Sequence, residues 1–298
     1  MRCIFMLFTS ILFSSISLGQ NKYDKFKLLF NQNDTIELQK LLIDWRKSNA
    51  NDPELYTSEF NYYFSVSKNE FVSLQQNIVD ENSYEIIDSL GNVAGYLTSN
   101  VSYNKEKLDK AFVAIDEGIR KFPNRLDMRF GKIYAYGKIE DYANFTKTIV
   151  ETVEYSVINN NEWLWTEDLK NEDGERVLLE TVQSYLVQLY DTENDNLLPN
   201  MITIGETTLK YYPKNVEILS TTAIAFLLMK NYDKAIYNLK NAEQISPQDY
   251  IVLNNIAQAY KMKGEKLNAI KYYELVAKYG DEETKYQALE NIEQLKVQ

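Results

Sequence analysis

Side chains that could perform covalent or acid–base chemistry are few in this chain. Its 298 residues include no histidine and a single cysteine, Cys3. A Ser-His-Asp triad, a histidine base and histidine metal ligands are therefore excluded. The ten glycines are scattered singly, so no glycine-rich loop is present to hold the phosphates of a nucleotide. We therefore expect neither a metal nor an organic cofactor.

The chemistry that remains is that of carboxylates. Two of the adjacent acidic pairs in the sequence, Glu140-Asp141 and Glu167-Asp168, are candidates for such chemistry, because paired carboxylates perform the acid–base work of glycosidases. Acidic pairs are also routine on the solvated faces of helices, and nothing in the sequence marks either pair as buried or perturbed. We interpret both as surface charge and predict that the chain is not an enzyme.

The stretch from Val157 to Glu175 is the least regular in the chain and is long for a connection between helices. It holds Trp163 and Trp165, whose rings could stack on a sugar or grip a peptide. The alternative is that one or both rings fill a gap between neighbouring structural units, because tryptophan is mostly buried. We favour packing and keep the loop as a possible ligand site.

A second acidic stretch, from Asp191 to Asp195, superficially suggests a calcium loop. A loop of the EF-hand kind would need a glycine where Asn196 stands and a carboxylate where Ile202 stands. Neither is present, so we predict that no metal binds here.

The clearest internal pattern lies between Val216 and Gly280, where the sequence repeats itself at a fixed offset. The recurring pairs are Leu219 and Leu253, Ala223 and Ala257, Ala225 and Ala259, Phe226 and Tyr260, Ala235 and Ala269, Ile236 and Ile270, Leu239 and Tyr273, and Ala242 and Val276. A fixed period of about 34 residues is typical of stacked helical hairpins, each too small to bury its apolar face alone.

Each copy is expected to form two short helices, in the first copy over 216–229 and 232–245. Ala223 and Ala257 are expected where two helices cross closely, because a larger side chain would hold the backbones apart. Pro247 ends the first copy, since proline cannot continue a helix. Gly264 can supply a left-handed turn at the end of a helix.

The two copies resemble the tetratricopeptide repeat. The segment LSTTAIAFLLMKNYDKAIYNLKNAEQISP carries the small residue, aromatic residue, later alanines and closing proline of that family in order. The second copy departs from the family pattern at Val276 and Asp281. The resemblance implies an all-α fold, a right-handed α-α superhelix of helical hairpins, with its clearest repeats at 216–248 and 250–281.

The resemblance also implies that the first helices line a concave, peptide-binding groove. The groove residues would be Glu217, Ser220, Ile224, Leu227, Leu228, Ile251, Asn254, Gln258, Lys261 and Met262. Some family members grip a partner's terminal carboxylate with a cluster of basic residues and asparagines. This face offers Asn255 and Lys261 but no matching basic cluster, so that function is not carried over.

The chain before these repeats shows several other features. Residues 1–19 are typical of a cleaved secretory signal peptide, with Arg2 before a short apolar run and small residues at the cleavage site. Weaker helical pairs follow, and the segment RLDMRFGKIYAYGKIEDYANF resembles uncharacterised exported tetratricopeptide proteins of Gram-negative bacteria. Alternating residues around Gly91-Asn92 predict a β-hairpin within 70–103, with Phe71–Leu74 as a possible third strand. We expect this hairpin to pack on the helices, because isolated hairpins are marginally stable.

The end of the chain predicts an amphipathic helix over 282–297 that caps the stack. Its expected inward residues are Tyr286, Leu289, Ile292 and Leu295. The formal net charge of the whole chain is −11, which disfavours nucleic acid and anionic membranes as partners. We therefore expect an exported, periplasmic or secreted, non-enzymatic scaffold for a protein or peptide, with a basic partner favoured if charge guides binding. The alternative is a carbohydrate-binding accessory protein that uses Trp163 and Trp165.

Overall fold

The computed structural model describes residues 22–77 and 83–297. The predicted signal peptide at residues 1–19 lies outside the described residues. The chain divides into two compact units. The first holds the described residues up to Ala135 together with Leu164–Lys170, and the second holds Tyr136–Trp163 and the described residues from Asn171 onward.

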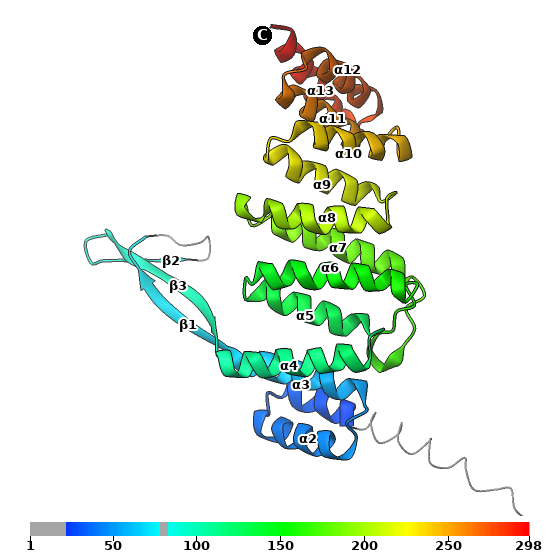
Figure 1. Cartoon of the computed structure of the whole chain (residues 1–298). Helices are drawn as coiled ribbons and strands as arrows, with labels where there is room; N and C mark the ends of the chain where they lie inside the picture. The colour runs from blue at the N-terminus through cyan, green and yellow to red at the C-terminus, as the bar shows by residue number, and fades with distance from the viewer. Residues whose placement is uncertain (1–21, 78–82, 298) are drawn as a thin grey trace, which may run out of the picture. The chain divides into compact units, whose positions relative to one another are not determined.

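Short helices form the body of the first unit. A helix over residues 22–31 precedes α2 (Thr35–Ser48) and α3 (Pro53–Ser67), and α4 (Lys105–Lys121) packs lengthwise against α3 (Figure 1). The next helix, α5 (Leu126–Lys138), begins in this unit. Asp34, Asp52 and Asn104 accept backbone hydrogen bonds at the starts of α2, α3 and α4, as N-cap residues do.

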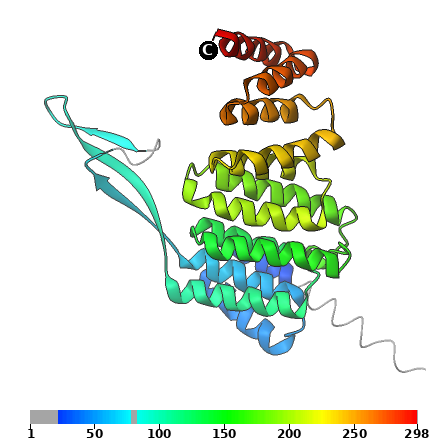
Figure 2. The same cartoon turned by 45° about the horizontal axis from the view of Figure 1, so that its top comes forward.

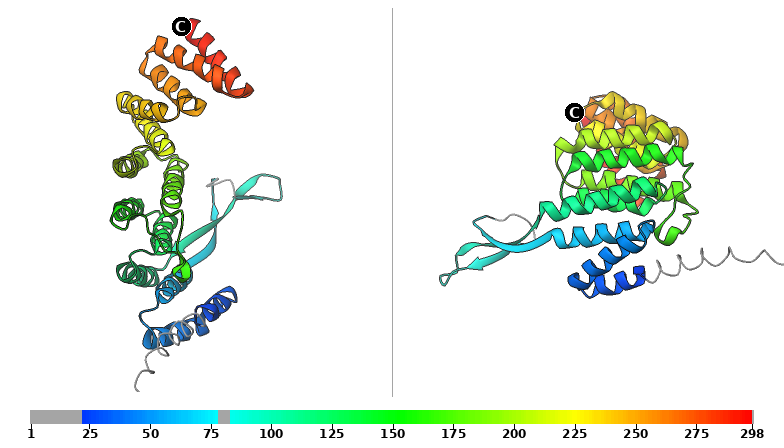
Figure 3. Two further views of the ribbon diagram at one scale, coloured as in Figure 1. Left: turned by 90° about the vertical axis from the view of Figure 1, so that its right-hand side faces the viewer. Right: turned by 60° about the horizontal axis from the view of Figure 1, so that its bottom comes forward.

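Helical hairpins also build the second unit, where they lie in two layers (Figure 3, left). The helices are α6 (Tyr142–Ile158), α7 (Gly174–Tyr190), α8 (Leu198–Tyr211), α9 (Val216–Leu228), α10 (Tyr232–Ile245), α11 (Tyr250–Lys263), α12 (Lys266–Tyr279) and α13 (Glu282–Val297). Helices α7, α9 and α11 contact one another in succession and form one layer, and α6 contacts α8 in the other. The fold is therefore all-α in its body, as the sequence predicts.

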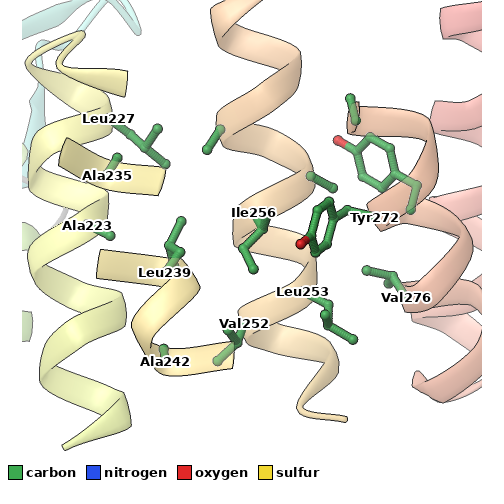
Figure 4. Close-up of a cluster of buried hydrophobic side chains, with 14 of the residues drawn as sticks. Ala223, Leu227, Ala235, Leu239, Ala242, Val252, Leu253, Ile256, Tyr272 and Val276 are labelled. Carbon is green, nitrogen blue, oxygen red and sulfur yellow. The ribbon is translucent and has the colours of Figure 1, made fainter. Parts of the chain in front are cut away.

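The repeated alanines occupy the core of the second unit, as predicted. Ala223, Ala235, Ala257 and Ala269 have no exposed surface, and they lie in one apolar cluster with Leu239 (Figure 4). At Gly264 the φ angle is +85°, which confirms the expected left-handed end of α11.

The last helix turns a different face inward from the one we expected. Tyr286 and Leu289 are exposed, and the buried residues of α13 are Ala288, Ile292 and Leu295. These three lie four and three residues apart, so they share one stripe that includes the small Ala288. The expectation for Tyr286 and Leu289 is wrong because the alanine, and not the larger side chains, faces α12.

The predicted β-hairpin is a three-stranded arm. Strands β1 (Lys68–Gln75), β2 (Tyr84–Ile87) and β3 (Val93–Tyr103) are antiparallel in the order β1-β3-β2. The β2–β3 connection spans residues 88–92 and is longer than the tight Gly91-Asn92 turn that we expected. The Asp88 carboxylate accepts hydrogen bonds from the backbone N–H groups of Leu90 and Asn92, and these bonds shape the loop.

The expectation that this hairpin packs on the helices is wrong. The arm extends from the ends of α3 and α4 (Figure 2; Figure 3, right), and most of its residues are exposed. The described residues of the arm are attached at its base, where the Tyr103 ring stacks on Phe64 at 5.6 Å and the Asn104 N–H donates to the Ser67 carbonyl. The third strand expected at Phe71–Leu74 is present as part of β1, and three paired strands support one another better than two.

Within the described parts of the chain, no helix has the length and apolar character needed to cross a membrane.

We predict that Gly205→Ala destabilises the second unit although alanine is the better helix former. A Cβ at Gly205 of α8 would lie 2.0 Å from Thr222 Oγ1 of α9, and Thr222 is fully buried. Overpacking of this kind costs about 1–3 kcal/mol, which exceeds the gain of up to about 1 kcal/mol in helix propensity. Thermal unfolding followed by circular dichroism should show a lower midpoint.

Gly131→Ala is the matched control for this prediction. A Cβ there would meet the Phe60 ring at an ordinary 3.4 Å, so alanine should keep or raise the midpoint. A Gly205→Ala variant as stable as Gly131→Ala would contradict the close crossing of α8 and α9.

Candidate functional site

The surface of α9 and α11 carries most of the predicted groove residues. Glu217, Leu228, Ile251 and Met262 are exposed, and Ile224, Asn254, Gln258 and Lys261 are half-buried. We call these eight residues the first-helix face. Most of them are three, four or seven residues from the next along each helix, which places them on one side, and the two helices contact each other.

Ser220 and Leu227 lie beneath this face and not on it. Leu227 belongs to the apolar cluster of the second unit, with an exposed fraction of 7%. The Ser220 hydroxyl is buried and makes no hydrogen bond, and the same holds for the Oε1 atom of Gln183 on α7. The Gln183 amide donates to Thr221 Oγ1 at 2.7 Å, next to Ser220 in the chain. Two unpaired buried polar atoms therefore lie in the layer that carries the first-helix face.

Lys261 is the cation of the first-helix face. Its Nζ atom donates to Asn291 Oδ1 of α13 at 2.7 Å, so the ammonium is engaged by a neighbouring helix. Asn255, the other residue considered for a carboxylate clamp, is half-buried on α11. The Lys261 ammonium therefore already has an amide oxygen as its acceptor.

A hollow of about 290 Å³ opens where α7 and α9 end. It is lined by Leu189, Tyr190, Asp191, Glu193, Asn194, Asp195, Leu198 and Leu228, and we call it the acidic hollow. Leu228 belongs both to this hollow and to the first-helix face, so the two are continuous. Sequence reasoning tested the acidic stretch only as a calcium loop and missed the hollow, because its walls come from α8 and α9 as well as from the turn.

The carboxylates of the acidic hollow are available to a ligand. Asp191, Glu193 and Asp195 are exposed, and none forms an ion pair with a residue in the described parts of the chain. The exposed large side chains beside them are Tyr190 and Leu228, whereas Leu189 and Leu198 lie nearly buried at the base, so the hollow combines negative charge with apolar surface. Across the residues that the structure describes, no group of three or more His, Cys, Asp or Glu side chains is placed to hold a metal ion.

Trp163 is a packing residue in the second unit. Its side chain has no exposed surface, its ring lies 5.8 Å from the Tyr155 ring, and its indole N–H donates to Asn161 Oδ1. Gly174, at the start of α7, leaves the space that the ring occupies, since a Cβ there would lie 2.9 Å from Trp163 Cδ1. The structure therefore fits the interpretation that Trp163 is a packing residue. Its ring cannot stack on a ligand in this conformation.

Trp165 belongs to the first unit and keeps 38% of its surface exposed. Its ring meets the Phe130 ring edge-on at 6.1 Å. The loop therefore presents one partly open indole to solvent and not the pair that a two-tryptophan sugar site would need.

The acidic pair Glu167-Asp168 lies in a charge cluster around Arg125, which is 1% exposed. The Arg125 guanidinium lies 2.7 Å from the Glu54 carboxylate, 2.8 Å from Asp127 and 3.3 Å from Asp168. The Glu167 N–H also donates to Glu54, at 2.7 Å. Burial raises the pKa of the Glu54 carboxyl, and the adjacent guanidinium opposes that rise.

This cluster has a structural role. It attaches the Leu164–Lys170 segment to α3 and α5, although Glu167 and Asp168 have left-handed φ angles of 60° and 53°. The other acidic pair is structural too, because Asp141 caps α6 by accepting from the Asn144 N–H. Neither pair is arranged as an acid and a base facing an open site.

No family model and no curated protein matches the chain. Solved structures do match, among them "YrrB: a TPR protein with an unusual peptide-binding site", at 12% identity and a TM-score of 0.41, covering 84% of this chain and 97% of that one. PilW, a "widely conserved type IV pilus biogenesis factor", matches at 10% identity and 0.38, covering 90% and 97%. The C-terminal part of a TPR repeat-containing protein from Cytophaga hutchinsonii matches at 16% and 0.39, covering 92% and 95%. These likenesses concern the fold alone.

We predict that Arg125→Met strongly destabilises the first unit. The variant leaves the buried Glu54 carboxylate without its partner, and breaking a buried ion pair in this way costs about 3–5 kcal/mol. Urea unfolding should show the loss, and a protease should cut within Leu164–Lys170 sooner than in the wild type.

Arg176→Met provides the control, because Arg176 is exposed on α7 and pairs there with Asp173 and Glu180. Its unfolding should be unchanged within error. Equal effects of the two substitutions would contradict the structural role of the Arg125 cluster.

Proposed function

We propose that this protein is a non-enzymatic scaffold that binds an extended, basic peptide or protein segment along the first-helix face and in the acidic hollow. The observation that carries the proposal is the continuity of the two surfaces at Leu228. The first-helix face supplies apolar and amide side chains in a row. The acidic hollow supplies unpaired carboxylates beside apolar side chains.

The apolar part of the proposal rests on exposed side chains that face solvent in a row. Ile251 is 58% exposed, Met262 47% and Leu228 43%, and Ile224 is half-buried between the neighbouring helices. Covering one such side chain completely is worth about 1.5–3 kcal/mol, so partial covering of several can anchor a short segment. Methionine adapts its shape to a partner better than a branched side chain does.

The polar part rests on groups that can bond a peptide backbone. Asn254 and Gln258 are half-buried amides on α11, and each offers both donors and acceptors. The unpaired Ser220 hydroxyl and Gln183 carbonyl lie in the same layer, and an unpaired buried polar group costs about 1–3 kcal/mol. Both atoms lie beneath the surface, so a segment bound on the face would bond Asn254 and Gln258 and not these two.

The acidic hollow favours a cationic side chain. The aliphatic stem of a lysine or arginine would pack against the exposed Tyr190 and Leu228, and its charged head would lie beside Asp191 and Asp195. The chain as a whole carries a formal net charge of −11, which steers basic partners toward it and repels nucleic acid.

Export to the periplasm or the cell exterior is also part of this proposal. It rests on the signal-peptide pattern of residues 1–19, with Arg2 and the following apolar run. The absence of catalysis in the proposal rests on the lack of histidine and on the structural engagement of both acidic pairs. A carbohydrate-binding role for Trp163 and Trp165 has less support, because only Trp165 has an open ring.

We predict that removing apolar side chains from the first-helix face weakens peptide binding. An array of random twelve-residue peptides would supply a binder, and fluorescence anisotropy of that labelled peptide would give its Kd. Ile251→Ser with Met262→Ser should raise the Kd about tenfold or more, because both side chains lose contact area. The matched control is Tyr237→Ser with Leu267→Ser, two exposed apolar residues of the second-layer helices α10 and α12. Equal losses in the two pairs would refute the proposed face.

We predict that neutralising the carboxylates of the acidic hollow selectively weakens the binding of basic peptides. Asp191→Asn, Glu193→Gln and Asp195→Asn together should raise the Kd for a binder rich in lysine or arginine about tenfold at low salt, and less at high salt. The control combines Glu274→Gln, Glu282→Gln and Glu290→Gln, which remove the same charge from exposed positions elsewhere in the second unit. If the array favours acidic peptides, or if both triple variants bind alike, the basic partner is ruled out.

A further inference from the structure

The β-arm of the first unit has one apolar and one polar face, as its register shows. Leu74 lies opposite Leu97, which lies opposite Tyr84, so these three side chains form a row across β1, β3 and β2. Val72 stands next to this row on β1, and Val101 stands farther along β3 on the same side. We call these five residues the apolar arm face.

The opposite side of the sheet is mostly polar and is tied together by side-chain hydrogen bonds. Asn100 Nδ2 donates to Ser73 Oγ at 2.7 Å, and Gln75 Nε2 donates to the same oxygen at 3.2 Å. The hydroxyls of Ser83 and Thr98 lie 3.1 Å apart. An antiparallel sheet with one polar and one apolar face normally packs the apolar face against a core.

No element in the described parts of the chain covers the apolar arm face. Exposed fractions are 77% for Tyr84, 66% for Val72, 64% for Leu74, 48% for Val101 and 38% for Leu97. Helices of the first unit meet the arm at its base, where Tyr103 stacks on Phe64, and the strands continue beyond them (Figure 1). Contiguous apolar surface of this kind marks an interaction site.

Charge decides which partner fits. Among the residues of the arm that the structure describes, the charged side chains on this side are Lys68 and Glu70, which pair with each other near the base. The described part of this face is therefore neutral on a chain whose net charge is −11, and it offers no attraction to a basic segment or to an anionic membrane. The same face on a second copy of this chain is neutral and apolar as well. Two such sheets can pack face to face as a two-layer sandwich.

We propose that the apolar arm face pairs two copies of this chain through a two-fold, sheet-on-sheet contact. Three strands spaced about 4.8 Å apart, with β1 about 26 Å long, give a footprint of roughly 350 Å² per copy. A stable interface buries about 800 Å² per partner, so the contact forms a weak dimer whose population depends on concentration. This inference does not rest on the proposed function, because the peptide site lies in the second unit.

Sedimentation velocity of the purified chain from about 2 to 200 µM tests the proposal. The weight-average mass should rise with concentration from that of a monomer toward that of a dimer. Val72→Lys with Leu74→Lys should keep the protein monomeric, raising the dimer Kd at least tenfold. Both residues are exposed, so the thermal midpoint and the circular dichroism spectrum should not change.

Phe71→Lys with Gln75→Lys is the matched control. These two exposed residues alternate with Val72 and Leu74 on the same strand and add the same charge to the opposite face. The control should dimerise like the wild type. A wild type that stays monomeric throughout, or equal effects of the two double variants, would overturn the proposal. Monomeric protein that binds neutral phosphatidylcholine vesicles would also overturn it and would assign the face to lipid.

Discussion

Close contact between helices at alanine and glycine is the constraint on which the rest of this fold depends. In the second unit Ala223, Ala235, Ala257 and Ala269 are fully buried, and Gly205 lets α8 approach Thr222 of α9. The first unit uses the same device, because a Cβ on Gly118 of α4 would lie 2.7 Å from the Tyr56 Cβ of α3. A hairpin of two short helices cannot cover its own apolar stripe, so its stability comes from how near the next hairpin can come.

The sequence predicts what depends on neighbours along the chain. Helix starts at Asp34 and Asp52, the turn at Gly264 and the buried alanines follow from local rules of capping, backbone freedom and periodicity. The features that were missed join distant residues. Arg125 meets Glu54 and Asp168 from separate segments, and the acidic hollow needs Leu228 beside Asp191. A single sequence carries no signal for such pairs unless a repeat relates them.

The arm shows a second limit of sequence reasoning. Alternation around Gly91 correctly predicts strands, but alternation cannot say whether an apolar row faces a core or solvent. The inference that the hairpin must pack on helices assumed that the chain itself supplies the cover. Leu74 and Tyr84 are exposed because the strands extend past the ends of α3 and α4. The two units thus present surfaces of different character: a neutral apolar sheet in one, and apolar and amide residues beside unpaired carboxylates in the other.

The path of the chain through its two units bears on how the protein matures. The Leu164–Lys170 segment belongs to the first unit, although the residues on both sides of it belong to the second. When the ribosome has released residues up to Ala135, Arg125 and Glu54 are present but Asp168 has not yet been made. Tandem domains usually fold one after another during synthesis, the N-terminal domain first. The first unit cannot complete its charge cluster in that order. The Glu54 and Asp127 pairs with Arg125 can form first, and the Asp168 contact is added only after part of the neighbouring unit has been translated.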